Sequence, residues 1–277
     1  MKRRVFIKRT LSAGAITALY AWQIEPFWLE FVRIKMPIKN LPKELIGKTL
    51  MQISDMHIGD KFDYNFISDS FKKAQKLNPD FVVYTGDFVS YKSEKQFAQL
   101  KEVFQHVVIG KLGTVGILGN HDYGKNWQES SVANQIVEIL KEHNVPILRN
   151  EQKLFNGLTI IGLDDYWGTN YKPQNALNHI NYDVANLVLC HNPDVVDEPV
   201  WNNYKGWILS GHTHGGQCKP PFLDAPMLPV KNKKYSAGKI NIEDGRTLYI
   251  NRALGNLWQL RFNVRPEITV FELEEMA

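Results

Sequence analysis

The segment TLMQISDMH, residues 49–57, starts with a short, mostly apolar run and ends in Asp55 and His57. Such a run is typical of a strand that is buried on both faces. Asp55 and His57 are two positions apart, so both side chains leave the strand on the same side and can bind a single ion. The same order, a buried strand followed directly by polar residues, recurs along the chain and decides our interpretation of the rest.

Further apolar runs predict the other strands. Each is short, contains β-branched or aromatic residues and is bounded by Gly, Asn or Asp. Together with residues 49–54, the predicted strands cover residues 81–84, 114–118, 158–163, 186–190, 207–210, 247–251 and 268–273. Residues 65–77 and 129–143 carry apolar side chains at helical spacing. Strands that alternate with helices indicate an α/β fold whose sheets are covered by helices.

Polar residues follow five of these predicted strands. Ligands of open α/β sheets bind at the carboxyl ends of the strands, so these residues are expected to meet in one crevice. They are Asp55 and His57, then Asp87, then Asn120 with His121 and Asp122, then His191, and finally His212 with His214. Five of the eight histidines of the chain are among them, which a scatter of ordinary polar strand ends would not explain.

This mixture of carboxylate, imidazole and amide groups points to divalent metal ions such as Mn²⁺, Fe²⁺ or Zn²⁺. Two ions roughly 3.5–4 Å apart can clamp a phosphoryl group and generate hydroxide at neutral pH. Asp87 is a candidate for the carboxylate between them. Cys190 and Cys218 are too few for a thiolate cluster, although a disulfide between them is conceivable in an exported protein.

The order D-x-H, G-D, G-N-H-D, H and G-H-x-H resembles the calcineurin-like metallophosphoesterase superfamily over residues 45–275. The Cys-His-Asn-Pro-Asp sequence around His191, the Gly-Gly-Gln after His214 and the tail 251–266 resemble its bacterial branch with an N-terminal membrane or export segment. The resemblance implies an α/β fold, a four-layer sandwich of two mixed β-sheets flanked by helices.

The resemblance also implies roles for the polar residues. The metal ligands that it implies are Asp55, His57 and His214 for one ion, Asn120, His191 and His212 for the other, and Asp87 as the bridge. It implies that His121 contacts the phosphate and protonates the leaving oxygen, with Asp122 orienting the His121 ring. Ser90 stands where purple acid phosphatases carry a tyrosine ligand, so a tyrosine-bound ferric site is not expected.

We therefore expect a dinuclear-metal-dependent phosphoesterase that hydrolyses a phosphodiester or pyrophosphate by a metal-bridging hydroxide. Mn²⁺ is the first choice of metal, with Fe²⁺, Zn²⁺ or Mg²⁺ as alternatives. The branch includes UDP-2,3-diacylglucosamine pyrophosphatases, so a narrower alternative is hydrolysis of that nucleotide lipid in lipid A synthesis. An alternative of another class is a non-catalytic, metal-stabilised binding protein, against which the presence of His121 beside Asn120 counts.

The N-terminal segment, residues 1–24, carries five basic residues and no acidic residue. The rest of the chain holds 28 basic and 29 acidic residues and is near neutral, so a duplex nucleic acid is not an expected partner. The segment resembles a twin-arginine export signal. The alternative is an uncleaved anchor at the inner membrane, which an aromatic run at residues 22–31 favours. Both interpretations make a membrane surface a partner, and a plain cytoplasmic helix is the remaining one.

Three features leave the substrate open. The Pro-rich loop 219–229 could receive an acyl chain, press on a membrane or simply pack on the core. The pair Asp164 and Asp165 could support the site from behind or form a turn. Several aromatic residues could stack on a nucleobase or sugar or be buried, namely Tyr123, Trp127, Tyr166, Trp167 and Tyr171.

Overall fold

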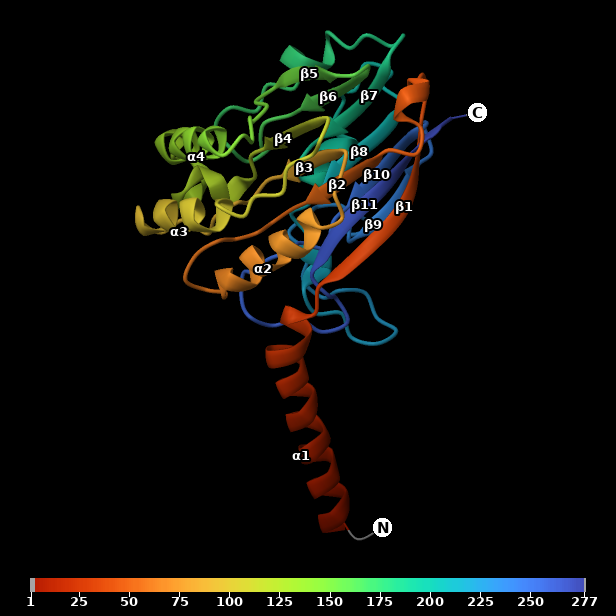
Figure 1. Ribbon diagram of the computed structural model, residues 1–277. Coiled ribbons are helices and arrows are strands. Elements are labelled where there is room, and N and C mark those ends of the chain that lie inside the picture. Colours follow the sequence, from red (N-terminus) through yellow and green to blue (C-terminus); the bar gives the residue numbers. More distant parts are fainter. Residues whose placement is uncertain (1–2, 277) are drawn as a thin grey trace.

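Two mixed β-sheets lie face to face, with helices on the outer face of each (Figure 1). The computed structural model describes residues 3–276. This architecture confirms the predicted four-layer α/β sandwich. Each of the eight strands and both helices predicted from the sequence is present, with bounds that differ by at most two residues.

The first sheet has five strands. In spatial order they are β1 (Glu30–Ile38), β11 (Glu267–Glu275), β2 (Thr49–Ile53), β3 (Phe81–Thr85) and β4 (Gly113–Ile117). Strand β1 runs parallel to β11, and β11 runs antiparallel to β2. Strands β2, β3 and β4 are parallel, so their carboxyl ends point to the same edge of the sheet. The sheet thus extends N-terminally to residue 30, ahead of residue 45.

The second sheet has six strands. In spatial order they are β5 (Glu151–Phe155), β6 (Leu158–Gly162), β7 (Ala185–Leu189), β8 (Gly206–Ser210), β10 (Arg246–Ile250) and β9 (Gly238–Ile242). The four central strands β6, β7, β8 and β10 are parallel, and the edge strands β5 and β9 are antiparallel to their neighbours. The carboxyl ends of β7 and β8 therefore also share one edge.

Five α-helices and seven short helical turns lie in the described part of the chain. The α-helices are α1 (Arg3–Leu19), α2 (Tyr64–Gln75), α3 (Lys95–Phe104), α4 (Ser130–Glu142) and α5 (Gln174–Leu177). The turns are η1 (Tyr20–Ile24), η2 (Glu25–Phe27), η3 (Lys43–Leu45), η4 (Asn120–Tyr123), η5 (Lys125–Trp127), η6 (Pro193–Asp197) and η7 (His214–Gly216). Turns η4 and η7 hold predicted site residues.

Alternating side chains on the central strands explain the layers. On β3, Phe81 and Val83 face the core between the two sheets, whereas Val82 and Tyr84 face the core under α2, α3 and α4. On β7, Leu187 and Leu189 face the core between the sheets, and Val188 faces the opposite core. Successive residues of a strand point to opposite faces, so a strand covered on both sides is apolar throughout.

Helix α1 projects away from this body (Figure 1), and none of its residues is buried. Residues 1 and 2 of the predicted segment 1–24 lie outside the described part of the chain. Within residues 3–276, no helix combines the length and the apolar character needed to cross a bilayer. Part of the run 22–31 that we interpreted as interface-like belongs to the body instead, because Phe27 stacks on Phe62 with ring centroids 5.3 Å apart. Trp22 and Trp28 remain exposed.

Candidate metal centre

The two sheets bring the seven predicted metal ligands together at one end of the sandwich. Strands β2, β3 and β4 of the first sheet and β7 and β8 of the second end directly before them. All seven are at most 5% exposed. Ligand atoms of six of these residues, and of His121, lie within 4.8 Å of one another in three overlapping sets, which are Asp55–His57–His214, His57–Asp87–His121 and Asp87–His191–His212.

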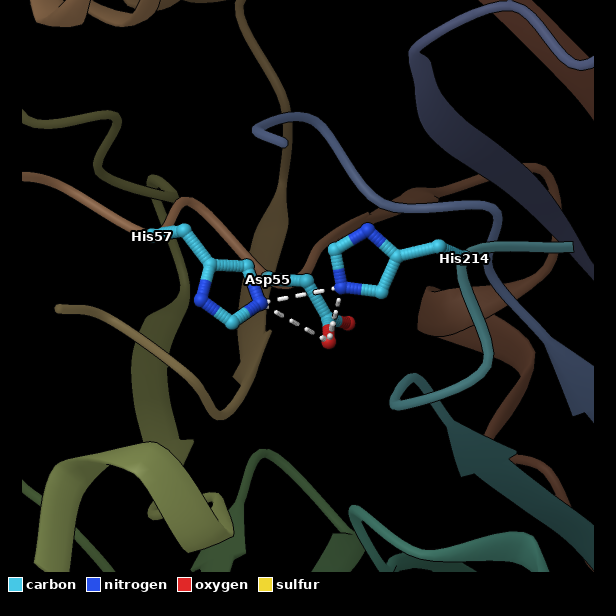
Figure 2. Close-up of side chains that lie close together, drawn as sticks. All are labelled: Asp55, His57 and His214. Carbon is cyan, nitrogen blue, oxygen red and sulfur yellow. Dashed lines mark hydrogen bonds and ion pairs between the residues drawn. The ribbon is translucent and has the colours of Figure 1, made fainter. Parts of the chain in front are cut away.

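The first set joins residues that are far apart in the sequence, as Figure 2 shows. The Nε2 atoms of His57 and His214 lie 2.9 Å apart. His214 Nε2 lies 3.3 Å from Asp55 Oδ1, and His57 Nε2 lies 3.9 Å from the same oxygen. Two imidazole nitrogens and one carboxylate oxygen thus converge on one point, which is the donor arrangement that a divalent ion accepts.

The Asp87 carboxylate lies between His57, which belongs to this first set, and His191, which comes from the other sheet. Its Oδ2 atom is 3.5 Å from His57 Nε2 and 3.2 Å from His191 Nε2. Its Oδ1 atom accepts a hydrogen bond of 2.8 Å from the backbone N–H of His121. One carboxylate therefore faces ligands from both sheets, and this is the position that the predicted bridging role requires.

The backbone at these positions is strained. Five of the seven predicted ligands have φ angles between 48° and 72°, namely Asp55, His57, Asp87, His212 and His214. Left-handed backbone costs a non-glycine residue free energy and persists only where its surroundings impose it, which is common at functional sites. Here Asp55 N donates to Gly86 O and His57 N donates to Asp87 O, at 2.9 and 3.0 Å.

Two glycines make room for the carboxylates. A Cβ atom on Gly119 would lie 2.3 Å from Asp87 Oδ1, and one on Gly211 would lie 2.1 Å from Asp55 Oδ2. Either contact is far shorter than van der Waals distance. Side chains at these two positions would therefore displace the predicted ligands.

Outer hydrogen bonds fix the tautomers of two histidines. His191 Nδ1 lies 2.7 Å from the carbonyl oxygen of Thr85, and His212 Nε2 lies 2.9 Å from that of Pro229. A carbonyl oxygen only accepts, so each of these nitrogens carries a proton, and in the neutral ring the other nitrogen offers a lone pair. His57 Nδ1 is held by Ser90 Oγ at 3.1 Å. Such partners orient metal-binding histidines in proteins.

The electrostatics favour the ligand forms of His57, His212 and Asp55 but not that of His191. Burial opposes protonation of His191, but the charges of Asp87 and Asp55 outweigh it and raise its pKa well above its ordinary value. Burial lowers the pKa of His57 well below its ordinary value, and burial, together with the charge of His191, lowers the pKa of His212 to about 3. Burial opposes ionisation of Asp55, but the charge of His191 and the hydrogen bond from His214 outweigh it and lower the pKa to about 2. Neutral imidazole and ionised carboxylate are the forms that bind divalent metals.

Two buried atoms lack the partner that a cation would supply. Asn120 Oδ1 and His191 Nε2 are fully buried and accept no hydrogen bond. A buried polar atom without a partner is costly and calls for an explanation. Both atoms belong to residues predicted to hold the same ion. The residues present at this site therefore fit a pair of divalent cations.

His121 and Asp122 are neighbours in the sequence, but their side chains make different contacts. His121 is partly exposed, with its ring centroid 5.0 Å from that of His57. The expectation that Asp122 orients the His121 ring does not match the structure. Asp122 accepts hydrogen bonds from the backbone N–H groups of Phe88, Val89 and Gly119 at 2.8, 3.2 and 2.9 Å. Its carboxylate points back into the turn η4 and ties the loops after β3 and β4 together.

Asp164 and Asp165 are more closely tied to the site than the sequence could show. Asp165 accepts hydrogen bonds from Trp167 N and Gly168 N at 2.8 and 3.0 Å, so the predicted turn is present. Its Oδ2 atom is buried without a partner, and burial raises its pKa to about 7. Asp164 accepts a hydrogen bond of 2.6 Å from the hydroxyl of Tyr123, behind η4.

The aromatic residues divide into two groups. Tyr123 is fully buried, and Tyr166 packs edge-on against Tyr171 with ring centroids 5.2 Å apart. Trp127 stacks on Trp167 with centroids 4.8 Å apart, and the Trp167 ring lies 4.6 Å from that of His212. The two tryptophans thus flank the cluster. Both cysteines, Cys190 and Cys218, are free thiols.

Comparison with known proteins agrees with this geometry. The family model for calcineurin-like phosphoesterases matches residues 48–216, a range that contains every predicted metal ligand. The chain belongs to the calcineurin-like phosphoesterase family. As a member of this family, it is a hydrolase that acts on phosphoester bonds.

Three bacterial relatives match the chain over almost its whole length. Phosphodiesterase YaeI of Escherichia coli is 29% identical, and the alignment covers 99% of each chain. The UDP-2,3-diacylglucosamine pyrophosphatase LpxG of Chlamydia trachomatis is 28% identical over 93% of each chain. The metallophosphoesterase YkuE of Bacillus subtilis is 30% identical over 99% of this chain and 98% of its own.

Proposed function

We propose that this phosphoesterase uses two divalent metal ions to hydrolyse a phosphodiester or a pyrophosphate in a membrane-associated substrate. The position of Asp87 Oδ2, within 3.5 Å of a histidine nitrogen from each sheet, carries the two-metal part of the proposal. The basic and then uncharged segment 1–24 supports the membrane part. Mn²⁺ is the first choice, and Fe²⁺, Zn²⁺ or Mg²⁺ are the alternatives, because the donor set contains only nitrogen and oxygen.

The ligand roles combine the sets of donor atoms with the unpartnered oxygen of Asn120. The proposed ligands are Asp55, His57 and His214 for one ion, Asn120, His191 and His212 for the other, and Asp87 for both. When bound, such a pair of ions polarises the phosphoryl group and supplies hydroxide at neutral pH. His121, which is partly exposed, donates a proton to the leaving oxygen in this proposal. Burial lowers the pKa of His121, so the ring must take up a proton before it can donate one.

The direct test is removal and return of the metal. The chelated protein is assayed with bis(p-nitrophenyl) phosphate and then reloaded with Mn²⁺, Fe²⁺, Zn²⁺ or Mg²⁺ in parallel. We expect no turnover without metal, recovery with Mn²⁺ and about two ions per chain by elemental analysis. Binding of a single ion, or full turnover in the chelated protein, would contradict the proposal.

Hydrolysis of UDP-2,3-diacylglucosamine is the narrower candidate. The similarity to LpxG over 93% of both chains favours it. The substrate is offered in mixed micelles, and UMP release is measured by chromatography. Release of UMP at a rate above that of bis(p-nitrophenyl) phosphate hydrolysis would support this candidate. Absence of UMP from a protein that still cleaves the soluble diester would exclude it.

We further propose that the N-terminal segment directs the chain to a membrane, either as a twin-arginine signal or as an anchor at the inner membrane. The test compares the intact chain with a variant that lacks residues 2–19, which stops short of Ala21 and its contact with the body. Loss of the membrane and exported fractions on deletion supports the proposal, and unchanged fractionation contradicts it. A paired Arg3→Lys and Arg4→Lys variant keeps the charge and separates the two routes, because only twin-arginine export requires both arginines.

A further inference from the structure

An apolar cavity adjoins the ligand cluster, and none of the roles above uses it. Its volume is about 510 Å³, within the roughly 300–1,000 Å³ of small-molecule sites. The loop after β8 and the loop after β10 form its walls, with Met227, Leu228 and Leu257 among the lining residues. His212 and His214 also line it. A molecule that fills the cavity therefore touches the residues proposed to hold the metal ions.

The residues that line the cavity are mostly apolar, and they favour a hydrocarbon ligand. Among the described residues that line the cavity, Lys233 alone carries a full charge. Its ammonium group donates to the carbonyl oxygens of Leu228 and Val230, so it is already engaged. The other polar side chains that line the cavity include His212 and His214, which belong to the ligand cluster. This arrangement fits a molecule with a polar group at the cluster and an apolar tail in the cavity.

Hydrogen bonds and close backbone packing hold the cavity walls in place. Gln217 Nε2 donates to the carbonyl oxygens of Trp258 and Leu260 at 3.1 and 2.9 Å, and this links the two loops. A Cβ atom on Gly216 would lie 2.4 Å from that of Ala225, so the backbone at Gly216 lets the loop close tightly. Preformed walls spare the entropy of ordering a loop when a ligand binds.

The rim of the cavity is apolar and exposed. Among the lining residues, Met227 is 67% exposed, Trp258 is 62% exposed and Leu260 is 43% exposed. Apolar side chains that gather around a cavity mouth are typical of surfaces that meet a lipid or a partner. The loops that carry this rim lie at the end of the body from which α1 projects (Figure 1).

Two hydrogen bonds join this end of the body to the segment that follows α1. Arg261 N donates to Ala21 O at 2.9 Å, and Gln259 Nε2 donates to Trp22 O at 3.1 Å. The C-terminal end of the segment proposed to reach the membrane therefore contacts the body next to the lining residues Trp258 and Leu260. A lipid tail could pass from a bilayer into the cavity without crossing the polar surface of the body.

We propose that the cavity between the 226–233 loop and the 257–260 loop binds a hydrocarbon chain of the substrate, an acyl or alkyl tail of a lipid whose phosphoryl group lies at the cluster. This inference rests on the proposed function and gives its substrate a chemical class. The tail adds binding free energy in proportion to its buried length, at up to about fourfold in kcat/KM for each methylene.

The test is a series of soluble diesters, methyl, butyl, octyl and dodecyl p-nitrophenyl phosphate, each below its micelle concentration. Release of p-nitrophenolate by the Mn²⁺-loaded protein is measured. We expect kcat/KM to rise with chain length and to level off when the cavity is full. Equal values for all four diesters would overturn the inference and leave the proposed function intact. If the metal-loaded protein cleaves none of them, the proposed function itself fails.

Variants of the wall locate the effect. Leu228→Gln and Leu257→Gln place an amide in the cavity, so the ratio of the dodecyl to the methyl value is expected to fall at least tenfold. The matched control is Leu154→Gln, because Leu154 is 64% exposed on the edge strand β5 and does not line the cavity. The control is expected to keep the ratio of the unchanged protein. An unchanged ratio in both wall variants would show that the chain binds elsewhere and would overturn the inference.

Discussion

The ligand cluster and the apolar cavity share His212 and His214 but are built in opposite ways. The cluster consists of side chains at most 5% exposed, held on strained backbone directly after strands. The cavity wall consists of loops, and Met227 in it is 67% exposed. In the ligand cluster the residue types are fixed, because the donor atoms must meet at fixed distances. The cavity needs only an apolar lining of suitable size, so changes there should alter substrate preference without removing the chemistry.

The largest effect is expected at Asp87, the residue common to both ligand sets. Asp87→Ala removes a carboxylate from each set, so both ions should be lost and kcat should fall at least about a thousandfold. Metal content is measured by elemental analysis and turnover with bis(p-nitrophenyl) phosphate. Asp69→Ala is the control, because the Asp69 side chain is 64% exposed on α2. An Asp87→Ala protein that keeps two ions and the full rate would contradict the proposed bridging role of Asp87.

A smaller effect is expected just outside the cluster. Ser90→Ala removes the hydroxyl that lies 3.1 Å from His57 Nδ1. Loss of such a partner typically weakens metal binding about 10- to 100-fold. Competition with a chromophoric chelator gives the affinity. Ser93→Ala, three residues along on the surface, should leave the affinity unchanged, and equal affinities in both variants would mean that Ser90 does not orient the ligand.

A change in the cavity wall should alter the substrate preference and leave the metal affinity unchanged. Gln217→Ala removes three hydrogen bonds that hold the loops together, at a cost of about 1 kcal/mol in the free energy of unfolding. Loosened walls should lower the preference for long-chain diesters several-fold, while the metal affinity stays within about twofold of its original value. A large loss of metal affinity would show that the two regions are not independent.

The smallest effect is expected at Asp80, which precedes β3 at the end remote from the cluster. Partial burial opposes ionisation of Asp80, but hydrogen bonds from Thr49 and the contact with Lys111 outweigh it and lower the pKa. The stabilisation is therefore present above the unfolded pKa of about 3.9 and is lost as the pH falls through the lower folded value. Asp80→Asn should cost about 1 kcal/mol at pH 7.

Urea unfolding of Asp80→Asn and of the unchanged protein is compared at several pH values. The difference in unfolding free energy should shrink below about pH 4. Taking the difference between the two proteins cancels the effect of metal release in acid. A difference that stays constant down to pH 3 would show that the charge of Asp80 contributes nothing.

The sequence predicted the cluster better than its surroundings. Each ligand follows a short apolar run, and the carboxyl ends of parallel strands share one edge, so Asp55, Asp87 and His191 could be assigned to one place. The strands were predictable because burial on both faces leaves an uninterrupted apolar run. Strand β1 was missed, because it lies at the sheet edge, and Arg33 and Lys35 interrupt its apolar run.

Other features depend on the folded chain. Asp122 hydrogen bonds to Phe88, 34 residues away, and no local pattern signals that contact. The histidine tautomers are set by the carbonyl oxygens of Thr85 and Pro229, which every residue possesses. The cavity arises where two loops of irregular backbone meet. The sequence alone therefore left several interpretations of loop 219–229.

The pairing of β2 has a consequence for how the chain is made. Gln52 pairs with Thr269 of β11 on one side and with Val83 of β3 on the other. A ribosome produces β2 and β3 long before β11, so one flank of β2 stays bare during most of translation. The strand that precedes Asp55 and His57 can be enclosed only after synthesis of β11, and a nascent chain that stalls before residue 267 offers an open strand edge to chaperones or to aggregation.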